Sequence, residues 1–231
     1  MKNVFKLFNK FDIILWVFSV AAIVVSFVVC GARDYLTLVS SITGVTALIF
    51  IVKGNVIGQI LTMIFAVFYG VVSYFFGYYG EMITYLGMSA PAALVATISW
   101  LRNPYKDSAQ VKVGKLTRVK VIVMIILATV VTVAFYFILD AINTTNLITS
   151  TISVTTSFIA AALTFLRIPL YGLAYAANDI VLIVLWVLAS IENVGYIPMI
   201  VCFTLFFVYD VYGFISWTRM KNKQTGEIKE E

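Results

Sequence analysis

The chain has 231 residues, of which 62% are apolar and 12% are charged, and its formal net charge is +5. A soluble domain carries about twice that charged fraction, so the composition excludes a water-soluble globular protein. The basic residues sit in short segments between apolar runs, which argues against nucleic-acid binding. The sequence lacks histidine, and we interpret its two cysteines, Cys30 and Cys202, as packing residues. The composition therefore predicts a polytopic membrane protein without a metal or a cofactor.

Charged and turn residues divide the chain into eight apolar runs, each close to the roughly 20 residues that a membrane-spanning helix needs. The first run, 11–31, is too long for the core of a signal peptide and is followed by no cleavage motif, so we interpret it as an extra N-terminal transmembrane helix. The other predicted helices cover 35–52, 55–77, 82–101, 119–140, 147–166, 168–190 and 194–218. A basic loop at 102–118 and a tail at 219–231 complete the predicted all-α fold.

The distribution of charge predicts the topology. With both termini in the cytoplasm, fifteen of the sixteen basic residues lie inside, and only Arg33 lies outside. The inside residues are Lys2, Lys6, Lys10, Lys53, Arg102, Lys106, Lys112, Lys115, Arg118, Lys120, Arg167, Arg219, Lys221, Lys223 and Lys229. The outside turns carry Asp34, Glu81, Asp140 and Glu192. This pattern follows the positive-inside rule and favours eight spans in a cell membrane.

An internal repeat is indicated by two similar helix ends. Ile98–Arg102 reads Ile-Ser-Trp-Leu-Arg, and Ile215–Arg219 reads Ile-Ser-Trp-Thr-Arg. We therefore predict two triple-helix repeats, 35–101 and 147–218, joined by a linker helix at 119–140. A repeat of three helices plus one linker is an even number of crossings, so the repeats are predicted to be parallel, as in some transporters. The alternative is two unrelated helix ends that share interfacial residues.

Polar side chains follow one face of several predicted helices. A polar group in hydrocarbon is costly unless it has a partner, so these faces predict either helix contacts or the wall of a chamber. The helix at 55–77 carries Gln59 and Tyr69. The helix at 82–101 carries Tyr85 and Pro91, and the proline predicts a kink.

The last two helices add intramembrane carboxyl groups, which are functional candidates by default. The helix at 168–190 places Asp179 on a face with four other polar or aromatic residues, Tyr171, Tyr175, Asn178 and Trp186. The final helix carries Asp210, with no Lys or Arg at a similar depth. These two aspartates predict a site for a cation or for protons, or hydrogen bonds to neighbouring helices.

An intramembrane aspartyl protease is a remote alternative that would use Asp179 and Asp210, because two adjacent carboxyl groups can share a proton. Tyr209-Asp210 matches half of that signature, but Asp179 follows Ala176-Ala177-Asn178 where the other half needs a Gly-x-Gly. The chain also lacks a phosphate-binding glycine loop and a nucleophile elbow. We therefore expect a transporter and not an enzyme.

Three stretches resemble the PnuC-type vitamin and nucleoside transporters. They are Lys53-Gly54-Asn55 through Gln59, the run Tyr79–Gly87, and Trp100–Tyr105, and Tyr209–Trp217 is similar to the closing element of that family. The resemblance implies a three-one-three fold with an optional N-terminal helix, homotrimeric assembly and facilitated diffusion of nicotinamide riboside. Related branches imply deoxynucleosides or thiamine as alternative cargo.

One motif departs from the family. Its nicotinamide riboside carriers have a Trp-x-x-Trp pair on the helix at 168–190, where this chain has Tyr171 and Ala174, while Asn178 matches the Asn that follows. We predict stacking of the cargo on Tyr171, Tyr175 or Trp186. Asn178 is expected to bind a carboxamide or base edge, and Asp179 or Asp210 a positive charge. The remaining predicted substrate-binding residues are Gln59 and Glu81, for ribose hydroxyls, with Tyr69, Tyr85 and Tyr212.

Overall fold

The computed structural model describes residues 7–31, 34–75, 78–106, 108–144 and 146–226. Residues 76 and 77, at the end of the third predicted helix, lie outside the described residues. The same holds for four residues of the charge count, Lys2, Lys6, Arg33 and Lys229.

The secondary structure of the described residues is helical, apart from one isolated β-bridge between Pro104 and Val111. The elements are α1 (Lys10–Val29), α2 (Tyr35–Val52), α3 (Val56–Phe75), α4 (Tyr79–Thr84), η2 (Tyr85–Ser89), α5 (Ala90–Leu101), α6 (Arg118–Ala141), α7 (Leu147–Phe165), α8 (Tyr171–Glu192), η3 (Val194–Tyr196) and α9 (Ile197–Thr225). Eight stretches of this part of the chain are long and apolar enough to cross a membrane, with α4, η2 and α5 forming one of them. The predicted all-α, eight-span architecture is confirmed.

Some helix ends differ from the sequence-based boundaries. Arg167 adopts a left-handed conformation (φ 60°), which ends the preceding helix, and α8 begins only at Tyr171, after Pro169. The last helix continues to Thr225 and ends at Gly226, whose φ is 79°, where the sequence suggested an end near residue 218. Glycine adopts this conformation at little cost and commonly ends helices.

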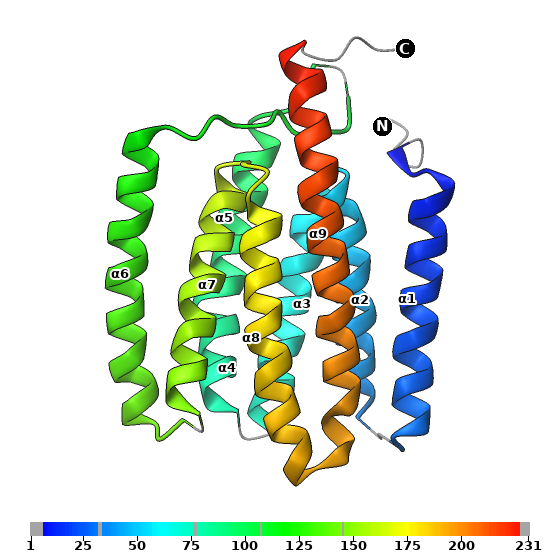
Figure 1. The fold of residues 1–231 in the computed structure, drawn as a ribbon, viewed down its shortest axis with the longest axis vertical. Helices are drawn as coiled ribbons and strands as arrows, with labels where there is room; N and C mark the ends of the chain where they lie inside the picture. The colour runs from blue at the N-terminus through cyan, green and yellow to red at the C-terminus, as the bar shows by residue number, and fades with distance from the viewer. Residues whose placement is uncertain (1–6, 32–33, 76–77, 107, 145, 227–231) are drawn as a thin grey trace.

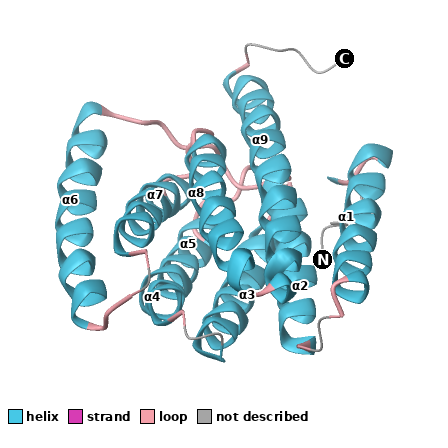
Figure 2. Ribbon diagram, turned by 60° about the horizontal axis from the view of Figure 1, so that its bottom comes forward, coloured by secondary structure: helices cyan, strands magenta, loops and turns pink. Residues whose placement is uncertain are grey.

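The helices stand side by side, and α1 and α6 occupy opposite edges of the bundle (Figures 1 and 2). Helix α6, which was predicted to be the linker, packs on α7, and only 6% of its apolar 18-residue stretch is buried. At the other edge α1 packs on α2 and α9. We group the six inner spans by their order in the chain and call them the first trio (α2, α3 and α4–α5) and the second trio (α7, α8 and α9).

The connections lie at the two ends of the bundle. The segment between α5 and α6 and the C-terminal end of α9 lie at one end, which we call the loop end (Figure 1). The connections from α1 to α2, from α6 to α7 and from α8 to α9 lie at the opposite end (Figure 1).

A buried ion pair fastens α1 to the loop end of the inner bundle. Lys53 Nζ lies 2.7 Å from Asp12 Oδ2, and the Tyr212 hydroxyl donates to Asp12 Oδ1 at 2.7 Å. Asp12 also belongs to a capping box, because its Oδ2 accepts from the Asn9 backbone N–H at 2.7 Å. The carboxylate thus orients the first turn of α1 and binds α2 and α9 at once.

Candidate functional site

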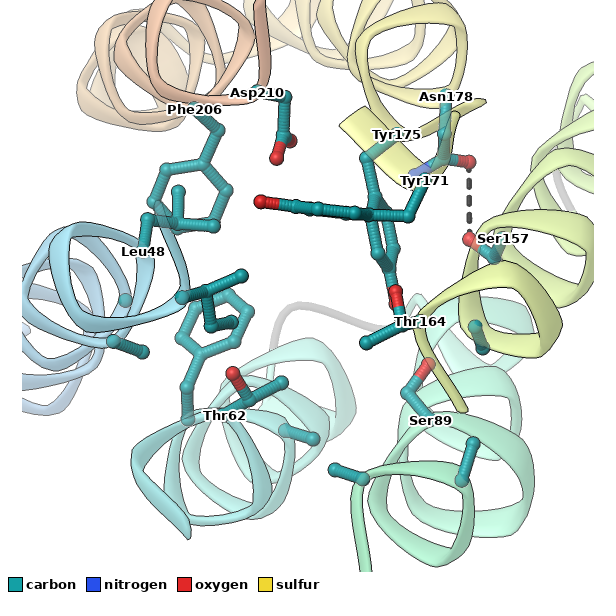
Figure 3. A pocket seen from close by; sticks show the side chains of 18 of the residues that line it. Leu48, Thr62, Ser89, Ser157, Thr164, Tyr171, Tyr175, Asn178, Phe206 and Asp210 are labelled. Atoms are coloured by element: carbon teal, nitrogen blue, oxygen red, sulfur yellow. Dashed lines mark hydrogen bonds between the residues drawn. The ribbon is translucent and has the colours of Figure 1, made fainter. Parts of the chain in front are cut away.

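A cavity lies between the two trios, and its volume is about 80 Å³ when measured as the space open to the centres of water molecules. A single water needs roughly 10–15 Å³ on that measure, so several fit. Side chains from both trios line the cavity (Figure 3). The polar ones are Gln59, Thr62, Tyr85, Ser89, Ser157, Thr164, Tyr171, Tyr175, Asn178, Asp179 and Asp210. We call this cavity the chamber.

Two carboxyl groups dominate the electrostatics of the chamber. Asp179 on α8 and Asp210 on α9 are both 3% exposed, and the two side chains lie close enough to interact directly. Oδ2 of Asp179 has no hydrogen-bond partner among the described residues, and no Lys or Arg is among the described residues that line the chamber. A buried carboxylate needs compensation, so this wall of the chamber favours a cation.

Asn178 is held in one orientation by α7. Its Oδ1 accepts hydrogen bonds from the hydroxyls of Thr156 (2.8 Å), Ser157 (3.0 Å) and Ser153 (3.4 Å). The carbonyl oxygen of Asn178 faces these three hydroxyls, and its amide nitrogen lies on the side away from Ser157 (Figure 3). In this orientation the amide N–H groups of Asn178 are the groups available to a ligand.

Tyr171 presents a polar atom to the chamber. Its side chain is buried, and its hydroxyl, which has no partner among the described residues, points toward Asp210 (Figure 3). Close packing of α9 fixes this position, because a Cβ on Gly213 would lie 2.6 Å from the Tyr171 Oη. The ring of Tyr175 lies 6.4 Å from that of Tyr171 in an edge-to-face arrangement. The two rings give the chamber an aromatic wall from α8.

The fourth span contains a π-helical turn beside the chamber. The backbone N–H of Ala90 donates to the carbonyl of Tyr85, one residue farther than in an α-helix. Pro91 follows directly, and proline disturbs the preceding turn because it lacks an N–H and its ring clashes with a carbonyl one turn earlier. The distortion expected at this proline takes the form of a π-turn, and the turn places Tyr85 and Ser89 on the chamber wall.

Four residues predicted from sequence to bind substrate lie outside the chamber lining. Tyr69 and Trp186 are hydrogen-bonded to each other, with the indole N–H donating to the hydroxyl at 3.0 Å. Glu81 is 2% exposed, and its Oε2 lacks a partner within the described part of the chain. Tyr212 on α9 donates its hydroxyl to Asp12, the carboxylate of the buried ion pair that fastens α1. The other seven predicted residues, Gln59, Tyr85, Tyr171, Tyr175, Asn178, Asp179 and Asp210, all line the chamber.

Sequence reasoning missed two parts of the wall. Small residues of α2, such as Gly44 and Ala47, bring their backbone close to the chamber but carry no polar signal. The hydroxyls of α7 that hold Asn178 come from a run rich in Ser and Thr at 149–157, which could have been recognised as a polar face. No group of acidic or cysteine side chains suited to a metal ion occurs among the described residues.

Eight apolar spans around a chamber with buried polar groups on its wall fit a membrane transporter. The model of the nicotinamide mononucleotide transporter family matches residues 34–219. The chain belongs to this family, which confirms the family indicated by the sequence motifs and makes the protein a transporter and not an intramembrane protease. Helix α1 lies before the matched residues.

Two known proteins illustrate the similarity. The nicotinamide riboside transporter PnuC of Neisseria mucosa (strain ATCC 25996 / DSM 4631 / NCTC 10774 / M26) is 25% identical over 219 residues, which cover 92% of this chain and 83% of that protein. The crystal structure of the vitamin B3 transporter PnuC superposes with a TM-score of 0.81 at 23% identity and covers 94% of each chain. At that identity the superposition shows a shared fold.

Proposed function

We propose that this protein carries nicotinamide riboside across the cell membrane by uniport, with the chamber opening alternately to either side. The observation that carries the proposal is the pair of buried carboxyl groups, Asp179 and Asp210, in a chamber whose described lining has no basic residue. Two adjacent buried carboxyl groups repel each other when both are ionised, and a bound cation offsets that repulsion. The pyridinium ring of nicotinamide riboside supplies such a cation.

The other wall residues fit the remaining parts of this cargo. The rings of Tyr171 and Tyr175 offer stacking surfaces for the pyridinium, at about 1–3 kcal/mol for a stacked base, with a cation–π contribution. The amide N–H of Asn178 suits the carbonyl oxygen of the carboxamide. The Gln59 side chain is 2% exposed and its Nε2 has no partner among the described residues, so it is available to the ribose hydroxyls.

The proposed orientation places the loop end in the cytoplasm. Arg102, Lys106, Lys112 and Lys115 all lie in or beside the segment between α5 and α6, and positive charge near short loops favours the cytoplasmic side. We also propose that the two trios are parallel repeats and that the protein assembles as a homotrimer. The exposed apolar face of α6 would support such an assembly, which the mass of the detergent-solubilised protein would report.

A binding panel tests the cargo. Calorimetry on the purified protein with nicotinamide riboside, thymidine and thiamine separates the three candidates, and failure to bind any of them would refute the proposal. Asp179→Asn should weaken nicotinamide riboside binding roughly ten- to hundredfold, since hydrogen bonds to charged groups are worth about 1.5–3 kcal/mol. Asp140→Asn, which changes an exposed residue at the end of α6, is the matched control. An unimpaired Asp179→Asn variant would remove the charge role of that residue.

A further inference from the structure

The end of the fourth span caps a helix of the other trio. The indole N–H of Trp100 donates to the carbonyl of Thr164 at 3.0 Å, and the Ser99 hydroxyl donates to the carbonyl of Phe165 at 2.9 Å. Both acceptors lie in the last turn of α7, where carbonyls lack the usual helical partner four residues on, and the Thr164 carbonyl also accepts from the Arg167 backbone N–H at 3.0 Å. The first trio thus satisfies the end of the first helix of the second trio.

The second trio caps a helix of the first trio in the same way. The indole N–H of Trp217 donates to the carbonyl of Ile51 at 2.8 Å, and the Ser216 hydroxyl donates to the carbonyl of Val52 at 2.9 Å. These carbonyls lie in the last turn of α2. Each donor of the second cap lies 117 residues after its counterpart in the first cap, and each acceptor lies 113 residues before its counterpart. We call the two arrangements the reciprocal caps.

The reciprocal caps meet at the end of the chamber that is nearer to the loop end. The rings of Trp100 and Trp217 are 5.2 Å apart between centroids, and both side chains are at most 2% exposed. On one side, the acceptor residues Ile51 and Thr164 line the chamber. On the other side, Trp100 lines a second, more open pocket of about 300 Å³, which residues of the segment between α5 and α6 also line. The tryptophan pair therefore stands between the chamber and a pocket at the loop end.

From this placement we propose that the reciprocal caps form the gate of the chamber at the loop end. All four hydrogen bonds join one trio to the other, so separation of the trios at this end breaks them together. The acceptors are carbonyls at helix ends, which entering water can hydrate in place of the lost donors. Opening therefore exchanges hydrogen bonds for hydration, which suits a contact that must form and break in every cycle.

The opposite end of the chamber has its own contact between the trios. Trp186 on α8 donates to the hydroxyl of Tyr69 on α3. The fourth tryptophan, Trp16, donates from α1 to the Thr46 hydroxyl on α2 at 3.0 Å and joins no trio to the other. The chain thus provides two matched controls for the loss of an indole N–H.

Accessibility of the chamber to a thiol reagent tests the gate. A reporter Ala161→Cys on the chamber wall, in a background with Cys30→Ser and Cys202→Ala, is labelled with a membrane-impermeant cationic methanethiosulfonate. Intact cells and inside-out vesicles give the two sides, and a separate Lys115→Cys variant identifies the preparation that exposes the loop end. The readout is a labelling rate and needs no cargo, so it stands even if the proposed cargo is wrong.

The expected results are specific to one side. Trp100→Phe and Trp217→Phe each remove one donor while retaining a ring, and each should raise the labelling rate from the loop end by about two- to tenfold, the equivalent of one lost hydrogen bond. Trp186→Phe should raise the rate from the opposite side, and Trp16→Phe should leave both rates unchanged. If either cap variant fails to accumulate in membranes, Ser216→Ala carries the same test. A rate unchanged at the loop end, or raised equally from both sides, would overturn the proposal.

Discussion

Replacing Asp12 by asparagine tests how α1 is held to the transporter. The Asp12 side chain is 0% exposed and that of Lys53 is 10% exposed. The substitution keeps one carbonyl oxygen, which can still accept from the Tyr212 hydroxyl or the Asn9 backbone N–H. It removes the negative charge, however, and leaves the Lys53 ammonium buried without its counter-ion.

The expected loss follows from that unpaired charge. Removing one partner of a buried ion pair costs about 3–5 kcal/mol, and the oxygen that asparagine retains places Asp12→Asn at the lower end, at about 3 kcal/mol. For a chain of this length, 1 kcal/mol lowers the melting temperature by about 2–4 °C. We therefore expect Asp12→Asn to melt roughly 6–12 °C below the wild type.

Thermal unfolding of the detergent-purified protein, followed by tryptophan fluorescence, measures this difference. The double variant Asp12→Asn with Lys53→Met removes both charges and should recover most of the lost stability, because an apolar side chain replaces the uncompensated ammonium. A loss below about 2 °C for Asp12→Asn, or a double variant that melts no higher than the single one, would show that the ion pair does not hold α1 in place.

Three further predictions concern the chamber. Gly213→Ala should destabilise the protein by about 1–3 kcal/mol, because the new Cβ meets the Tyr171 hydroxyl, and adding Tyr171→Phe should restore part of the loss in the same melting assay. Thr156→Val removes one of the three donors to Asn178 and should weaken cargo binding about two- to tenfold by calorimetry; unchanged affinity would mean that two hydroxyls suffice. Uptake by a uniporter should be insensitive to imposed proton or sodium gradients in proteoliposomes, and gradient dependence would indicate coupled transport.

The sequence predicted the spans well because the thickness of the bilayer sets their length and few charged residues lie within them. The helix at 35–52 was predicted with the bounds that α2 has, since Asp34 precedes it and Lys53 follows it. The π-turn was anticipated only as a kink at Pro91. Hydropathy reports which segments cross the membrane, and it carries little information on the geometry inside a span.

The sequence predicted which residues of the candidate site share a helix face, but not which residues of other helices they contact. A polar stripe on α8 correctly grouped Tyr171, Asn178 and Asp179 on the chamber wall, because helical periodicity determines a shared face. The same stripe included Trp186, which instead bonds to Tyr69 on α3. The Asp12–Lys53 pair was not anticipated, because it depends on which helices become neighbours, and that is decided by packing between distant segments.

The three hydroxyls on Asn178 have a consequence for chemical selectivity. A freely rotating amide would bind a hydrogen-bond donor or an acceptor equally well. In its present orientation Asn178 offers N–H groups to a ligand. A carboxamide oxygen satisfies it, whereas an exocyclic amine in the same corner would leave two donors confronting each other. A carboxylate would also offer an acceptor, but it would meet the acidic pair formed by Asp179 and Asp210 nearby. This corner of the protein should therefore distinguish an amidated ring from its deamidated or aminated analogues without any change in cargo size.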